Sequence, residues 1–248
     1  MQKKTGTKPR FEYLKDGNEE SAVAQWRERL QNSSEQVLRQ CEDAVALAPG
    51  ADCEEKLSES HQRILQMLEG FCQTLSEHTV RIPKPSGIFL SAEERQPAYR
   101  VICRILGETE TFQRELEAAI MEMLAIDSLL ARRTRAGNEA ARLLANVGAA
   151  TRHVAVSDAF FSKHGMLRAQ LTRENEKALR VREKAQTLQE KIKNFHEKSL
   201  PAFCSQIEVS ADMSHDGARC NPIALIRMCG ELLEVTRAVT GQIRGIEI

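Results

Sequence analysis

Apolar residues recur at intervals of three and four along most of this chain, which is the spacing of a buried helix face. The pattern is most regular between residues 108 and 200, where two long runs keep it without interruption. The first run extends from Phe112 to Val147 and the second from Leu167 to Phe195. An apolar repeat of this kind is typical of a coiled coil, so the two runs predict a long antiparallel helical hairpin.

The hairpin helices are predicted over about residues 108–148 and 157–200. Gly148 is expected to end the first helix, because glycine is favoured just after a helix C-terminus. Ser157 is expected to cap the second, because its hydroxyl can accept from a free helix N–H. Pro201 follows directly, and the pattern weakens after it.

A turn centred between these helices predicts which layers meet, with Leu116 opposite Leu188. The flanking charges are then paired as Glu115–Lys191 and Glu122–Lys184. The same register brings the two charged residues of the apolar rows, Arg133 and Glu174, into adjacent layers. We expect them to form a structural ion pair there, because either charge alone would be costly to bury.

Turn signals divide the rest of the chain. Residues 1–19 are expected to form a disordered basic tail, 20–79 an N-terminal helical pair, 80–90 a proline-rich linker, and 91–248 a helical bundle containing the hairpin. Asn221 followed by Pro222 predicts the start of a C-terminal helix over 222–246. We expect 20–79 to pack on 91–248 as one domain, with Trp26 anchoring the first helix to the bundle.

Composition agrees with this fold class. Apolar residues make up 42% of the chain and charged residues 28%, but aromatic residues only 4%. Sheets draw on aromatic and β-branched residues, so the balance favours long amphipathic helices and excludes collagen-like or wholly disordered chains. The predicted fold is therefore all-α: an elongated antiparallel helical bundle built on a long coiled-coil hairpin.

No targeting segment is indicated. The basic N-terminus lacks an apolar stretch after it, and the most apolar segment, 118–131, is interrupted by Glu122 and Asp127. It is too short for a transmembrane helix. Seven cysteines are irregularly spaced without a CxxC pair, which argues against a disulfide framework. We therefore expect a cytoplasmic protein.

Motifs for enzymatic chemistry are missing from the sequence. Phosphate-binding loops, hydrolase elbows and HExxH are not found, and no His follows a Glu at the spacing that di-iron bundles need. We expect no catalytic residue and no cofactor. Weak candidates for metal ligands are Cys204, His215 and Cys220, whose spacing matches no known site. His61 is expected to be a partly buried, hydrogen-bonded core residue.

Charge is distributed unevenly, although 35 Lys and Arg balance 35 Asp and Glu. Residues 49–80 hold 2 basic and 6 acidic groups, while 128–173 hold 8 basic and 2 acidic groups. The candidate anion-binding residues at the hairpin tip are Arg132, Arg135, Arg142, Arg152, Lys163, Arg168 and Arg173. Phe160 and Phe161 lie among them and are candidate apolar anchors. Alternatively, these arginines contact the acidic 49–80 helix and the two Phe residues belong to the core.

The function that we expect is that of a non-enzymatic scaffold or interaction protein, which acts through the hairpin surface or its basic tip. Its partner would be another protein or a second copy of the chain. The alternative is a binder of nucleic acid or anionic lipid through the basic segment 128–173, because Lys and Arg bind phosphates. Fold alone does not choose between these functions.

Overall fold

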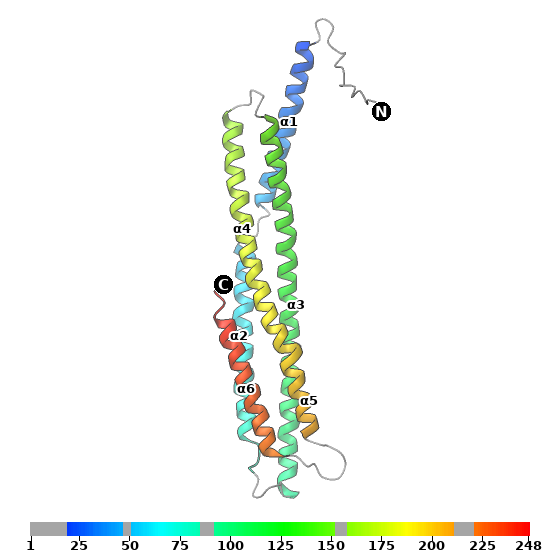
Figure 1. The fold of residues 1–248 in the computed structure, drawn as a ribbon, viewed down its shortest axis with the longest axis vertical. Coiled ribbons are helices and arrows are strands. Elements are labelled where there is room, and N and C mark those ends of the chain that lie inside the picture. Colours follow the sequence, from blue (N-terminus) through cyan, green and yellow to red (C-terminus); the bar gives the residue numbers. More distant parts are fainter. Residues whose placement is uncertain (1–18, 47–50, 85–91, 152–157, 211–220) are drawn as a thin grey trace, which may run out of the picture. The chain divides into compact units, whose positions relative to one another are not determined.

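A computed structural model describes residues 19–46, 51–84, 92–151, 158–210 and 221–248, which are helical apart from short ends and contain no strand. The helices are α1 (Glu19–Ala46), α2 (Ala51–Val80), α3 (Ala92–Thr151), α4 (Asp158–Asn194), a π-helical turn η1 (Phe195–Ser199), α5 (Leu200–Ser210) and α6 (Pro222–Arg244) (Figure 1). The predicted all-α helical bundle is therefore confirmed over this part of the chain.

The chain divides into two compact units. Unit 1 comprises Met1–Ala48 and Arg135–Asn175, and unit 2 comprises Pro49–Thr134 and Glu176–Ile248. The division falls between α1 and α2 and within the hairpin helices, not at the proline-rich stretch 80–90. That 20–79 packs on 91–248 as one domain stays a prediction.

Unit 2 is built around one apolar core to which α2, α3, α4, η1, α5 and α6 all contribute. Phe71 and Phe112 stack with their ring centroids 4.1 Å apart, and Phe195 meets Phe112 edge-on at 6.2 Å. These three rings join α2, α3 and the π turn. Figure 1 shows α6 running beside α2, where His61 Nε2 lies 2.8 Å from the carbonyl oxygen of Ile243. The prediction of a partly buried, hydrogen-bonded His61 is confirmed.

Unit 1 packs α1 against the adjoining parts of α3 and α4, with α1 antiparallel to α3 (Figure 1). Its core consists of Leu38, Cys41, Ala140, Leu144, Phe160, Leu167 and Leu171. The Cys41 thiol donates to the carbonyl oxygen of Ala140 at 3.5 Å, which fixes the height of α1 along α3.

The two predicted apolar rows face the core. Every residue of both rows is buried, apart from Arg133, Val147 and Glu174, which are half-buried. α6 also begins as predicted, because the Asn221 side chain accepts from the N–H groups of Ile223 and Ala224. The helix period therefore identified the buried faces, and the Asn221 cap identified the start of α6.

The predicted register between the rows is wrong by about one heptad. In unit 2, Asp127 bonds to Arg182 at 2.7 Å and to Gln186 at 2.9 Å, whereas the predicted register puts the preceding residue, Ile126, opposite Ala178. In unit 1, Asn175 Nδ2 donates to Asn138 Oδ1 at 3.1 Å, again further along the second helix than predicted.

The predicted flanking pairs fail with that register. Glu122 accepts from Arg63 of α2, and Lys191 Nζ donates to Gln242 Oε1 of α6 at 3.1 Å. Neighbouring helices, and not the opposite arm of the hairpin, therefore satisfy these two side chains.

Both ends of the hairpin differ from the prediction. α3 continues through Gly148 to Thr151. The absence of a side chain at Gly148 leaves room for the His164 ring, whose Nε2 bonds to the Leu144 carbonyl oxygen at 2.9 Å. Ser157 lies outside the described residues. At the other end, the helix does not stop before Pro201: a π turn, in which the Leu200 N–H bonds to the Phe195 oxygen, carries the chain into α5. A proline removes one helix donor and crowds the preceding turn, which the wider π turn accommodates.

Candidate interaction surfaces

The basic residues of the hairpin tip differ in their surroundings. Lys163 Nζ is 2.7 Å from Glu42 Oε1 of α1, so its charge is neutralised within unit 1. Arg152 lies outside the described residues. The remaining five side chains are exposed and, among the described residues, have no ion-pair partner: Arg132, Arg135, Arg142, Arg168 and Arg173.

The two candidate apolar anchors, Phe160 and Phe161, lie in different environments. Phe160 is 8% exposed and belongs to the core of unit 1, which agrees with the alternative that it is structural. Phe161 is 44% exposed and contacts the Phe160 ring edge-on at 5.7 Å. Of these two residues, only Phe161 therefore offers an apolar side chain to a partner.

Arg135 and Arg142 belong to a stripe of alternating charge on α3. Glu139 stands between them, and spacings of four and three place all three on one side of the helix. All are exposed. The net basic charge of the segment conceals this alternation, and the sequence prediction did not find it.

A second stripe, on α2, has the opposite signs in the same order. Asp52, Lys56 and Glu59 are exposed and have the same spacings of four and three. Other acidic residues of α2 are paired within unit 2: Glu54 lies 2.8 Å from Lys177, and Glu69 accepts from Arg244. The acidic 49–80 helix is thus partly neutralised by α4 and α6, but this stripe is not.

The first turns of α1 carry exposed apolar side chains. Trp26 is 55% exposed and Val23 is 49% exposed, whereas Leu38 and Cys41, further along the same helix, are buried against α3 and α4. The prediction that Trp26 anchors the helix is therefore wrong, because the core of unit 1 does not extend to its position.

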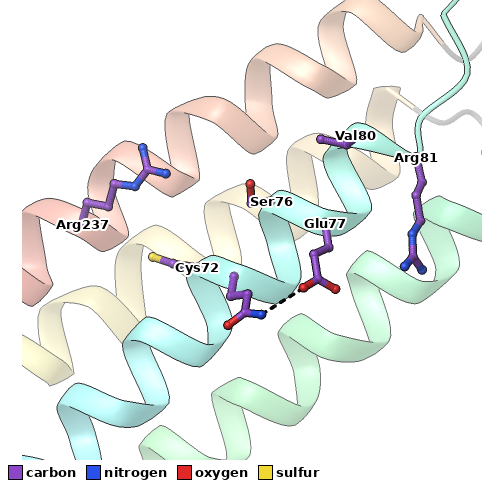
Figure 2. A pocket seen from close by; sticks show the side chains of 7 residues that line it. Cys72, Ser76, Glu77, Val80, Arg81 and Arg237 are labelled. Atoms are coloured by element: carbon purple, nitrogen blue, oxygen red, sulfur yellow. Dashed lines mark hydrogen bonds between the residues drawn. The ribbon is translucent and has the colours of Figure 1, made fainter.

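A surface groove of about 470 Å³ lies along α2 near its C-terminus, with Arg237 of α6 at its edge (Figure 2). Burial raises the pKa of the Cys72 thiol, although Arg237 acts in the opposite direction. A thiol that stays protonated is a weak nucleophile. The other polar side chains are Gln73, which donates to Glu77 Oε1 at 3.1 Å, together with Ser76 and Arg81. The groove holds no activated nucleophile.

The described residues do not form a metal site from the weak candidates Cys204, His215 and Cys220. His215 and Cys220 lie outside the described residues. Burial, followed by the charges of Glu208 and Glu110, raises the pKa of Cys204, which disfavours the thiolate that a metal requires. Within the described residues, no three His, Cys, Asp or Glu side chains gather as metal ligands.

The predicted ion pair between Arg133 and Glu174 would join the two units, because Arg133 belongs to unit 2 and Glu174 to unit 1. Within unit 2, Arg133 Nη1 lies 3.6 Å from the Cys53 sulfur. The pair stays a prediction, but the register from which it was derived is wrong.

Comparisons with known proteins place the chain in no family. No protein-family model matches the chain, and no curated protein matches it. Among solved structures, a computationally designed three-helix bundle is similar with a TM-score of 0.34 and 12% identity, covering 90% of this chain and 96% of that one. Over the residues that are described, no helix is long and apolar enough to cross a bilayer.

Proposed function

We propose that this chain is a non-enzymatic, cytoplasmic helical interaction protein that binds another protein through the exposed end of α1 beside the hairpin tip. The observation that supports this is the exposure of Trp26 and Val23 on a helix whose other half is part of a core. Neighbouring apolar side chains that are exposed to solvent are typical of binding surfaces. The six described cysteines are free, which is compatible with a reducing compartment.

The geometry of unit 1 explains why α1 has an uncovered end. Trp26 stands about 22 Å before Cys41 along α1, at 1.5 Å per residue. From Ala140, the contact of Cys41, α3 continues only about 16 Å to its end at Thr151. The first turns of α1 therefore extend past α3 and need another helix to cover their apolar face.

The test is affinity purification from the native cells with the full chain. We expect a protein that co-purifies with the wild type to be lost from the Val23→Gln/Trp26→Gln variant. An Ile223→Gln variant is the matched control, because Ile223 is 63% exposed on unit 2 and should bind as the wild type does. An unchanged set of bound proteins in the α1 variant contradicts the proposal.

A second candidate function is binding of nucleic acid or anionic lipid by the tip arginines. Five exposed arginines without an ion-pair partner among the described residues favour it. Phosphate contacts release counterions, so such binding should weaken steeply as salt rises. Duplex DNA and vesicles of an anionic phospholipid, each titrated at low and at physiological salt, test this function. Undetectable binding at low salt eliminates it.

A further inference from the structure

The two charged stripes fit each other. Along α3 the order is Arg135, Glu139, Arg142, and along α2 it is Asp52, Lys56, Glu59, with every sign reversed. Each stripe covers about 10 Å of its helix, at 1.5 Å per residue. If two such helices lie side by side and parallel, each charge of one stripe meets an opposite charge at the same height on the other, which gives three ion pairs.

Both stripes are available for this contact. All six side chains are exposed, and in the described part of the chain none of them has a hydrogen bond or an ion pair. Forming the contact would therefore break no interaction seen within a unit. Chains of zero net charge also do not repel one another at neutral pH.

We propose that the α3 stripe of one copy binds the α2 stripe of a second copy, so that the partner on this surface is the chain itself. This inference is independent of the exposed end of α1. A polyphosphate fits the α3 stripe less well, because Glu139 would face the phosphates. Two copies close into a dimer if both contacts form across a twofold axis, and otherwise extend into a chain.

Sedimentation of the full chain tests the inference. A few exposed ion pairs support only weak association, so protein concentrations up to about 0.5 mM are needed. We expect the mean mass to rise with concentration at about 20 mM NaCl and to fall back towards the monomer at about 500 mM, because salt screens charges. A monomer throughout the low-salt series overturns the proposal.

Charge reversal locates the surface. Arg135→Glu/Arg142→Glu and Asp52→Lys/Glu59→Lys should each weaken association at least about tenfold, as expected when like charges meet. Arg100→Glu/Arg104→Glu is the control: it changes the net charge equally at exposed positions of α3 outside the stripe, and should associate as the wild type does. Association that is unaffected by both stripe variants overturns the proposal.

Mixing the variants distinguishes binding through complementary stripes from a general attraction between molecules of opposite net charge. The Arg135→Glu/Arg142→Glu variant should associate with the Asp52→Lys/Glu59→Lys variant. The Arg100→Glu/Arg104→Glu control has the same net charge but should associate with that partner more weakly. Its unchanged α3 stripe is repelled by the altered α2 stripe, so only the control's α2 stripe can bind the partner's α3 stripe. Equal association in both mixtures overturns the proposal. Circular dichroism and a thermal melt establish that each variant is folded.

A zero-length cross-link shows whether the contact is between copies. A carbodiimide should join the Lys56 amine to the Glu139 carboxylate as an amide with loss of water. In a mixture of ¹⁵N-labelled and unlabelled protein, we expect cross-linked peptides with one labelled and one unlabelled half. Peptides with both halves from one chain only would place the contact within a molecule and overturn the proposal. So would duplex DNA or anionic vesicles that bind these arginines while the chain remains a monomer.

Discussion

The packing of the hairpin within unit 1 can be tested by adding one methyl group at each of two glycines. Gly137 lies on α3 and is buried, and a Cβ there would overlap the Oδ1 of Asn175 on α4. Gly165 lies on α4 and is exposed, with nothing within 4 Å of the added carbon. Gly→Ala is therefore the same chemical change at one crowded and one open helical position.

The two substitutions should change the free energy of unfolding in opposite directions. Alanine is favoured over glycine inside a helix by about 1 kcal/mol, so Gly165→Ala should stabilise the protein by up to that amount. At Gly137 the same gain is opposed by about 1 to 3 kcal/mol of overpacking. Moving Asn175 also breaks its 3.1 Å hydrogen bond to Asn138, worth about 1 kcal/mol. Gly137→Ala should therefore destabilise the protein by about 1 to 3 kcal/mol.

Thermal denaturation followed by circular dichroism measures both effects. We expect the midpoint of Gly165→Ala to rise by about 2 to 4 °C and that of Gly137→Ala to fall by at least about 2 °C. Gly137→Ala/Asn175→Ala should lose most of the crowding, because the clashing oxygen is removed. A Gly137→Ala variant that is as stable as Gly165→Ala would refute the close approach of α4, and with it the observed register.

Three further predictions concern unit 2. Ser60 is buried and its hydroxyl has no hydrogen-bond partner among the described residues, so Ser60→Ala should raise the unfolding free energy by about 1 kcal/mol in urea titrations; a loss would show that the hydroxyl is satisfied. Phe112→Ala removes the ring that contacts both Phe71 and Phe195 and should cost about 3 to 5 kcal/mol in the same assay, and a cost below 1 kcal/mol would contradict this packing. Burial raises the pKa of Cys229 from 9.0 to about 11, although a hydrogen bond to Thr79 opposes the change. The unfolded chain then loses this proton first, so stability present below pH 9 should fall by about 2 to 3 kcal/mol between pH 9 and 11. Cys229→Ala should flatten that fall, and an unchanged pH profile would contradict the raised pKa.

The sequence predicts which residues of the hairpin face the core, but not which layers meet. A heptad repeat specifies one face of each helix, and all the apolar residues of the two predicted rows are buried or half-buried. Sliding one helix by seven residues presents the same kinds of positions to the other, so the repeat cannot choose between registers. The choice depends on where α3 ends. Gly148, read as a stop signal, is instead a contact point for His164 inside the helix.

Exposure is equally hard to derive from spacing. Trp26 lies on the same helix as the buried Leu38, but at a height where α3 no longer accompanies α1. Phe160 and Phe161 are neighbours in sequence, yet successive residues of a helix point about 100° apart, so one is core and the other surface. Exposure therefore depends on how far the neighbouring helix extends and on which way each side chain points in the folded unit. Neither can be read from the local sequence.

The strength of single ion pairs limits what the charged stripes can do. An exposed pair contributes about 0 to 1 kcal/mol, so three pairs supply at most about 3 kcal/mol to one stripe contact, and the two contacts of a closed dimer at most about 6 kcal/mol. A dissociation constant of 1 µM needs about 8 kcal/mol. The proposed contact between Arg135, Glu139, Arg142 and their counterparts should therefore be transient at ordinary concentrations. It would become stable only when joined to an apolar contact. In the described part of unit 1, the exposed end of α1 with Trp26 offers such a contact. A protein bound there that brings two copies together would convert a weak, salt-sensitive contact into a firm one, because the second contact then forms at high effective concentration.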